Sequence, residues 1–452
     1  MLDARRCECV TSRGLDFRSE IIDNLNSCPS SFPILPPISQ FPKPVMPSIS
    51  AFPKLRPLNI QAIHHQGSPA LLLQDPFQLA GQYIILPQVY GPVLYLLDGT
   101  RDLAALERDL RQQFGLGVEA GALEALIAAL DQVYFLENAR FQKAYEEARQ
   151  QYYQLPHRPM LIAGEGYPAD PDELKAQFDA YLAAIGPVEP MPASGRLVFS
   201  PHIDYLRGHE VYARVWKAAS AMARQAELVI ILGTDHYGGY NQVTLTRQSY
   251  ATPYGILPTD QVLVDRLARA LGEERVFAGE LYHLGEHSLE LVLVWLHHMR
   301  EGAPVPTLPI LVGSLLPFLD APHPPAADPT LARLLSELRV ILQERPNTLV
   351  VASGDLAHVG PAFDGDPVDA AKLAEIRRLD EEMLGLLAAG DAEGFWRVIQ
   401  RVRDANNVCG VAPFYLSLKA VGAVEGARAG YAVCPADEHQ TSVVTVGGLV
   451  FG

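Results

Sequence analysis

The chain has 452 residues, of which 48% are hydrophobic and 19% are charged, and its formal net charge is -16 at pH 7. This length favours two domains, and the acidic balance disfavours a nucleic-acid partner, since phosphate binding needs a concentrated basic surface. No apolar run approaches the roughly 18 to 20 residues that a membrane-spanning helix needs, so we expect no membrane insertion.

The first 60 residues are rich in proline and serine, and we expect residues 1–60 to be a disordered leader. Three of the five cysteines lie there, at Cys7, Cys9 and Cys28, but no fourth metal ligand is near them. Five cysteines do not make a disulfide framework, and the N-terminus lacks the apolar core of a secretory signal. These features predict a cytoplasmic protein.

Residues 70–140 are expected to form a small domain whose strands and helices follow one another as in a winged helix. YIILP at 83–87 predicts a strand, and an amphipathic helix over 100–115 ends at Gly115. A second helix follows, and the apolar YFL at 134–136 predicts a short closing strand.

Two stretches of this domain, LLDGTRDLAAL at 96–106 and LDQVYFLE at 130–137, resemble PqqD-like domains. Such domains are small peptide-recognition modules found beside radical-SAM enzymes, so the resemblance implies a peptide partner. A winged helix that reads DNA is the alternative. From Asp98 to Arg140, however, four Arg and no Lys stand against eight Asp and Glu, which argues against DNA.

A charged helical linker is expected over 141–157, followed by a large α/β domain over 158–452. Four apolar runs in this domain are typical of strands buried on both faces. They are RLVF at 196–199, ELVIIL at 227–232, LPILVG at 308–313 and TLVVA at 348–352. The pattern predicts a mostly parallel or mixed central sheet flanked by helices.

Polar side chains follow three of these strands directly. The pairs are His202 with Asp204, Asp235 with His236, and Asp355 with His358. In open α/β sheets, sites form beyond the carboxyl ends of the strands, where loops from several strands converge. We therefore expect these side chains to meet at one edge of the sheet.

Two further candidates stand at the starts of helices. Glu286 and His287 precede a strongly apolar stretch, which predicts a buried helix. Cys409 begins another helix, behind Asn407 as a plausible cap. A helix N-terminus favours the thiolate, which is the form of cysteine that binds metals.

Each candidate also has a purely structural interpretation. A single strand-end histidine could be an ordinary loop residue, and Cys409 alone could be a small buried hydrophobe. His297 and His298, at the far end of the helix that follows His287, are expected at the surface. The functional interpretation gains weight only because several candidates should converge.

Seven motifs occur in order between residues 158 and 452: SPHIDY, ILGTDHYGG, ATPYG, GEHSLE, LPILVGS, SGDLAHVG and VCG. Together they resemble the MEMO family, also called system protein B of the AmmeMemoRadiSam set, which shares its fold with class III extradiol dioxygenases. The resemblance implies radical-SAM and AMMECR1-like partner proteins.

Carried over by position, the family's metal ligands fall on His202, His236 and Cys409. Its neighbouring pocket residues fall on His358, Asp355 and His287, which are the candidate catalytic residues; the matching histidine of the dioxygenases acts as acid and base. Glu286 matches the motif without a defined role.

Three of the motifs depart from the family pattern. Tyr237 replaces a second histidine, Tyr254 replaces a leucine, and Val411-Ala412 replaces Arg-His after the Cys-Gly pair. The lining of the pocket therefore differs from that of the family, and the substrate cannot be carried over.

Two histidines and a thiolate leave room for an exogenous ligand. Oxygen-activating iron sites more often use two histidines and a carboxylate, and a thiolate softens the site toward copper(I) or zinc. We expect iron or copper, with zinc as an alternative. Asp204, Asp235 or Asp355 could orient the imidazoles, and His358 could act as a general acid or base.

The leading hypothesis is a metal-dependent redox or oxygen-using protein that acts on a peptide or a small aromatic substrate. A second hypothesis is a non-catalytic adaptor that binds peptides in the same cleft. The third is an extradiol ring-cleaving dioxygenase, ranked last because a cysteine stands where such enzymes use a carboxylate.

Overall fold

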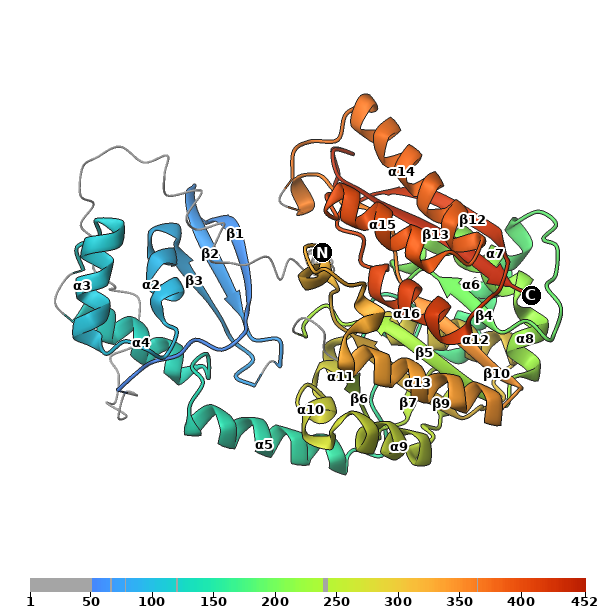
Figure 1. The fold of residues 1–452 in the computed structure, drawn as a ribbon, viewed down its shortest axis with the longest axis horizontal. Helices are drawn as coiled ribbons and strands as arrows, with labels where there is room; N and C mark the ends of the chain where they lie inside the picture. Colours follow the sequence, from blue (N-terminus) through green and yellow to red (C-terminus); the bar gives the residue numbers. More distant parts are fainter. Residues whose placement is uncertain (1–50, 66, 78, 119–120, 239–242, 364) are drawn as a thin grey trace. The chain divides into compact units, whose positions relative to one another are not determined.

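The computed structural model describes residues 51–452 except 66, 78, 119–120, 239–242 and 364 (Figure 1). These residues form two compact units, a smaller one that ends at Gln154 and a larger one that begins at Leu155. Residues 1–50 of the expected leader, with Cys7, Cys9 and Cys28, lie outside the described residues. Within the described ranges, no helix is long and apolar enough to cross a membrane.

The described residues of the smaller unit form a three-stranded antiparallel sheet and four α-helices. The strands, in their order in the sheet, are β1 (Asn59–His65), β2 (Ser68–Gln74) and β3 (Tyr83–Pro87). The helices are α2 (Gly91–Leu96), α3 (Leu103–Phe114), α4 (Ala122–Gln132) and α5 (Ala139–Gln154). One apolar core joins β2 and β3 to α2, α3 and α4.

Helix α3 confirms the amphipathic helix predicted from the apolar spacing. Asp102 caps its N-terminus by accepting a hydrogen bond from the Ala105 N–H at 2.8 Å. Leu106 and Leu110 are fully buried in the core. Gly115 ends the helix at a φ of 64°, a left-handed conformation that glycine adopts without steric cost.

Two features of the smaller unit differ from the sequence prediction. β1 begins at Asn59, inside the segment expected as leader, and pairs with β2 along its whole length. The expected closing strand over 134–136 is reduced to an isolated bridge between Leu136 and Leu55. The sheet therefore forms mainly from strands that precede the helices.

The larger unit is built on the expected mixed sheet, which has eight strands in the order β11-β13-β4-β10-β5-β9-β6, with β12 paired to β13. The four predicted strands are β4 (Leu197–Ser200), β10 (Thr348–Ser353), β5 (Leu228–Thr234) and β9 (Thr307–Val312), which are parallel and fully buried. The antiparallel strands are β6 (Val243–Leu245), β11 (His358–Val359), β12 (Gly426–Pro435) and β13 (Val443–Phe451). A separate hairpin pairs β7 (Tyr250–Thr252) with β8 (Gly255–Leu257).

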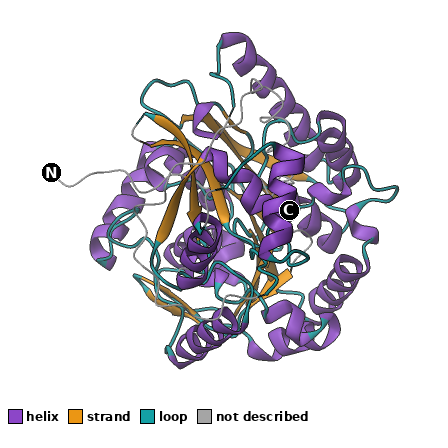
Figure 2. Cartoon of the chain, turned by 90° about the vertical axis from the view of Figure 1, so that its left-hand side faces the viewer, coloured by secondary structure: helices purple, strands orange, loops and turns teal. Residues whose placement is uncertain are grey.

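Helices flank this sheet, as the view by secondary structure shows (Figure 2). The first six are α6 (Pro171–Ala184), α7 (Tyr205–Ala218), α8 (Ser220–Gln225), α9 (Gln261–Leu271), α10 (Glu273–Phe277) and α11 (Tyr282–Gly285). The others are α12 (Ser288–Met299), α13 (Pro329–Glu344), α14 (Ala370–Ala388), α15 (Ala392–Val402) and α16 (Val411–Val421).

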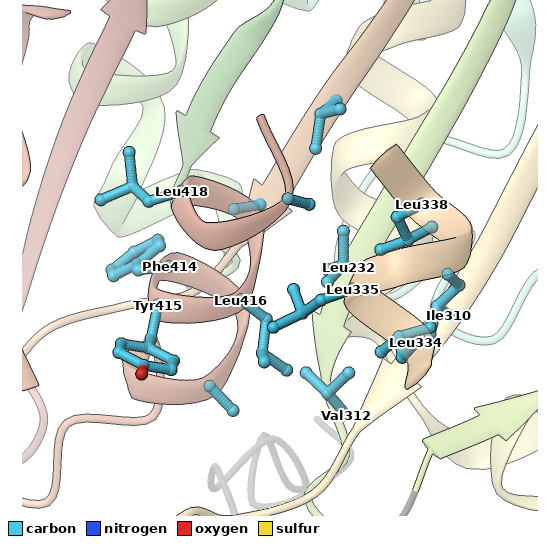
Figure 3. Close-up of a cluster of buried hydrophobic side chains, with 14 of the residues drawn as sticks. Leu232, Ile310, Val312, Leu334, Leu335, Leu338, Phe414, Tyr415, Leu416 and Leu418 are labelled. Atoms are coloured by element: carbon cyan, nitrogen blue, oxygen red, sulfur yellow. The ribbon is translucent and has the colours of Figure 1, made fainter. Parts of the chain in front are cut away.

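The two faces of the central strands bury different helices. On one face, Leu335 of α13 and Leu416 of α16 pack near Leu232 of β5 (Figure 3). Gly233 points to the other face, where a Cβ atom would lie 2.7 Å from Leu289 of α12. Helix α12 therefore approaches β5 more closely than it could if residue 233 carried a side chain.

Candidate metal centre

The parallel strands β4, β5 and β10 end side by side. Ser353, the last residue of β10, is paired with Ser200 of β4 and with Gly233 of β5. His202 and His236 each follow a strand end by two residues, and their ring centroids lie 5.1 Å apart. The expectation that the strand-end side chains meet at one edge of the sheet is confirmed for these two.

His202, His236 and Cys409 each offer one ligand atom, and these atoms lie within 4.8 Å of one another. Nε2 of His202 lies 3.1 Å from Sγ of Cys409. Both histidines are buried, whereas Cys409 is partly exposed. Sγ of Cys409 also accepts a hydrogen bond from the Asp355 N–H at 3.1 Å, and such a bond stabilises the thiolate form of the cysteine.

Asn407 does not cap α16, contrary to the sequence prediction. The N-cap position is occupied by Gly410, which has no side chain to bond to the helix start. Asn407 has a φ of 48°, which is uncommon outside glycine. Its side-chain Nδ2 donates to the carbonyl of His358 at 3.2 Å, and its own carbonyl lies 3.1 Å from Nδ1 of His358. Asn407 therefore holds His358 in place.

Glu286 orients His236. Nδ1 of His236 lies 3.0 Å from both carboxylate oxygens of Glu286, which also accepts the His236 backbone N–H at 2.9 Å. Since a carboxylate only accepts, Nδ1 carries the proton and Nε2 is left for a metal. Burial lowers the pKa of His236, but Glu286 outweighs this effect and raises it. Burial opposes ionisation of Glu286, yet His236 holds the Glu286 pKa below its usual range.

The three aspartates expected to orient the imidazoles accept hydrogen bonds from backbone N–H groups instead. Asp204 caps α7, and Asp235 accepts backbone N–H groups of the turn that follows it. Oδ1 of Asp355 accepts the backbone N–H of His202 at 2.9 Å, while Oδ2 lies 3.8 Å from Nε2 of that residue. The carboxylate that orients a ligand is thus Glu286, which the motif GEHS contains but to which sequence reasoning assigned no role.

The three candidate catalytic residues surround the same cluster. Asp355 and His358 form a second potential ligand group with Cys409, and His287 forms a third with His236 and Glu286. The ring of His287 stacks on that of His236, with centroids 5.2 Å apart and planes 9° apart. All six predicted site residues therefore lie at one edge of the sheet.

Asp355 supports the fit of a cation. Its Oδ2 is buried and has no hydrogen-bond partner among the described residues. Burial raises the pKa of Asp355 to about 7, because a buried carboxylate loses its hydration. A buried, unpartnered carboxylate oxygen beside two imidazoles and a thiol is a donor set that suits a transition metal.

His358 is held as a neutral imidazole with its proton on Nδ1. Its Nδ1 faces the carbonyl oxygens of Leu356 and Asn407, each at 3.1 Å, so Nδ1 must carry the proton. Burial lowers the pKa of His358 to about 4, and the ring is therefore neutral at pH 7. The free electron pair is then on Nε2.

His297 and His298 are not at the surface, contrary to the sequence prediction. His297 is 1% exposed; its Nδ1 lies 2.7 Å from Oγ1 of Thr252, and its Nε2 lies 2.9 Å from the carbonyl of Gly302. The side chain of His298 is 7% exposed, and its Nδ1 lies 3.0 Å from the hydroxyl of Tyr254. Both residues pack the C-terminal end of α12.

Comparison with known proteins matches the larger unit to one family model. The model of Memo-like proteins matches residues 158–450, which include all six candidate site residues. A MEMO1 family protein of Aquifex aeolicus is 26% identical over 391 residues, covering 84% of this chain and 95% of that protein. MEMO1 family proteins of Thermus thermophilus and Methanopyrus kandleri are each 29% identical, over 65% and 61% of this chain and 82% and 91% of their own lengths.

Proposed function

Because this chain belongs to the family of Memo-like proteins, we propose that it binds iron or copper through His202, His236 and Cys409 and acts as a metal-dependent redox protein. The observation that carries the proposal is the approach of Nε2 of His202 to Sγ of Cys409 at 3.1 Å, inside a buried cluster that includes His236. A soft thiolate beside two imidazoles favours iron, copper(I) or zinc over hard cations.

The metal, when bound, would supply the electron transfer and oxygen chemistry that side chains alone lack. The chain's own residues would position the metal ligands and transfer protons. Glu286 fixes the ring of His236, and the Asp355 N–H group holds the sulfur of Cys409. His358 presents an unprotonated Nε2 to the cluster, while Asp355, with a pKa of about 7, can hold or release a proton at neutral pH.

Metal analysis tests this proposal. The full chain, purified without oxygen or chelators, should hold close to one iron or copper per chain, and Cys409→Ser and His202→Ala should abolish it. Cys434→Ser is the matched control, because Cys434 is a buried thiol outside the three ligand groups. No metal in a folded wild-type chain would overturn the proposal and favour a peptide-binding adaptor.

A peptide is the substrate class that we propose for this site, with a small aromatic compound as the alternative. The likeness to the Aquifex aeolicus protein extends over 84% of this chain, which is more than the Memo-like region occupies. Part of the smaller unit therefore accompanies the Memo-like region in that relative too, and a PqqD-like unit would present a peptide. If the full chain binds no peptide encoded beside its gene, and no radical-SAM or AMMECR1-like protein, this part of the proposal fails.

A further inference from the structure

Three residues with buried hydroxyl groups lie next to the ligands and are linked by hydrogen bonds from side-chain hydroxyl to backbone carbonyl. They are Thr234 at the end of β5, Ser288 at the start of α12 and Ser353 at the end of β10, and none is more than 5% exposed. Ser353 Oγ donates to the Ser288 carbonyl at 2.6 Å, and Ser288 Oγ donates to the Thr234 carbonyl at 2.8 Å. Thr234 Oγ1 donates to the carbonyl of Cys409 at 2.9 Å.

His202 closes this series into a ring. Its Nδ1 lies 3.3 Å from Oγ of Ser353, and its Nε2 lies 3.1 Å from Sγ of Cys409. A serine hydroxyl has one proton, and Ser353 gives it to the Ser288 carbonyl at the shorter distance. The side of Ser353 Oγ that faces His202 is therefore an acceptor, which favours the proton on Nδ1 of His202 and an unprotonated Nε2 toward Cys409.

We propose that Ser353 is a positioning residue that fixes His202 in the Nδ1-protonated tautomer and thereby presents Nε2 to the metal. The consequence for metal binding rests on the proposed function, whereas the tautomer itself does not. His236 reaches the same tautomer through the carboxylate of Glu286. The two imidazoles thus have unlike partners, one anionic and one neutral, and Ser353 orients His202 without adding a negative charge to the cluster.

Ser200 provides a matched control. It is fully buried at the end of β4 and is paired with Ser353 in the sheet. Its Oγ donates to the carbonyl of Pro201 and accepts from Nε1 of Trp216, each at 3.2 Å. Ser200→Ala therefore removes a buried hydroxyl from the neighbouring strand end while leaving the partner of His202 in place.

Nitrogen NMR of the full chain, labelled with ¹⁵N-histidine and free of metal, reads the tautomer directly. His202 is identified by the signal that His202→Gln removes. In the wild type, Ser200→Ala and Ser353→Thr, we expect a protonated Nδ1 and an unprotonated Nε2. In Ser353→Ala, we expect that pattern to give way to a mixture of tautomers. An unchanged pattern in Ser353→Ala would overturn the proposal.

Titration with Co²⁺ supplies the second readout. Loss of a group that orients a metal-binding histidine typically weakens binding by about 10- to 100-fold. The Kd for Co²⁺ should therefore rise at least about tenfold in Ser353→Ala relative to Ser200→Ala, and equal Kd values in these two variants would also overturn the proposal. If the wild type binds no Co²⁺, the metal-free NMR spectra alone decide the role of Ser353, and the metal analysis alone decides the proposed function. If Ser353→Thr does not fold, the comparison of Ser353→Ala with Ser200→Ala still decides it.

Discussion

Histidines lie at both ends of helix α12, and among the described residues only the one at its N-terminal end belongs to a group of potential metal ligands. Beside its N-terminus, the ring of His287 lies 5.2 Å from that of His236 and 5.4 Å from that of His202. Near its C-terminus, His297 has both ring nitrogens within hydrogen-bond distance of a partner, Thr252 Oγ1 and the Gly302 carbonyl.

The difference lies in how the two ring nitrogens are used. In His236, a carboxylate holds Nδ1 and leaves Nε2 for the site. His283 resembles His297, because the Tyr250 hydroxyl and the Thr244 carbonyl occupy its two nitrogens. A buried histidine whose two nitrogens both bond to groups outside the ligand cluster stabilises the fold, whereas one that is held at one nitrogen and faces the cluster with the other is prepared to bind a metal.

The largest effect on stability should come from a buried ion pair that joins α12 to the start of the larger unit. Arg158 and Glu290 are fully buried and bonded to each other, and Arg158 Nη2 also donates to the Glu286 carbonyl at 2.9 Å. Arg158→Met should lower the free energy of unfolding by about 3–5 kcal/mol, because it leaves a buried charge without its partner. Urea denaturation measures this loss, and a double variant with Glu290→Gln should recover part of it.

Asp380 is a buried carboxyl that belongs to none of the three potential ligand groups. Burial raises the pKa of Asp380 to about 6, and its Oδ2 accepts a hydrogen bond from the Tyr431 hydroxyl at 2.8 Å. The folded chain therefore binds more protons than the unfolded chain between about pH 4 and pH 6, so this group's contribution to stability falls as pH rises.

Asp380→Asn removes the ionisable group, and with it the loss of stability that its ionisation causes as pH rises. Its free energy of unfolding relative to the wild type should increase from pH 4 to pH 7 by up to about 3 kcal/mol, since one pKa unit corresponds to about 1.4 kcal/mol. Urea denaturation at several pH values checks the slope. A difference that does not change with pH would contradict the assignment of a raised pKa to Asp380.

Glu286→Gln should weaken metal binding with little change in stability. The amide can still accept from the backbone of His236, but it no longer holds the proton on Nδ1 through a negative charge. We expect the Kd for Co²⁺ to rise about 10- to 100-fold, measured by titration under argon. Binding as tight as that of the wild type would show that Glu286 has no part in orienting the ligand.

His297→Gln should have the smallest effect of these variants: it should lower stability slightly and leave metal binding unchanged, the reverse of Glu286→Gln. It disturbs two hydrogen bonds at the far end of α12, so the free energy of unfolding should fall by about 1–2 kcal/mol. The Kd for Co²⁺ should stay within the error of the wild-type value. A loss of metal in a folded His297→Gln chain would break the distinction between the two ends of the helix.

The sequence predicted the central strands and the strand-end residues because both depend on local patterns. Apolar runs located β4, β5, β9 and β10, and polar residues directly after three of them located His202, His236 and Asp355. The partners of these residues could not be predicted in this way. Glu286 is 50 residues from His236, and Ser353 is 151 residues from His202. Only the folded chain brings them together.

The burial of His297 and His298 was missed for a related reason. Their place at the end of an apolar helix suggested exposure, but Thr252 and Tyr254 of a distant hairpin cover them. In the smaller unit, β1 and β2 lie in or next to a segment whose composition suggested disorder. There β1 pairs with β2 and β2 pairs with β3, and no local sequence pattern reveals these pairings.

X-ray absorption spectroscopy of the zinc-loaded full chain identifies the atoms that bind the metal. We expect one sulfur neighbour at about 2.3 Å and imidazole nitrogens at about 2.0–2.1 Å. Cys409→Ser should remove the sulfur signal, and Cys434→Ser should keep it. A first shell without sulfur in the wild type would contradict a metal centre built from His202, His236 and Cys409.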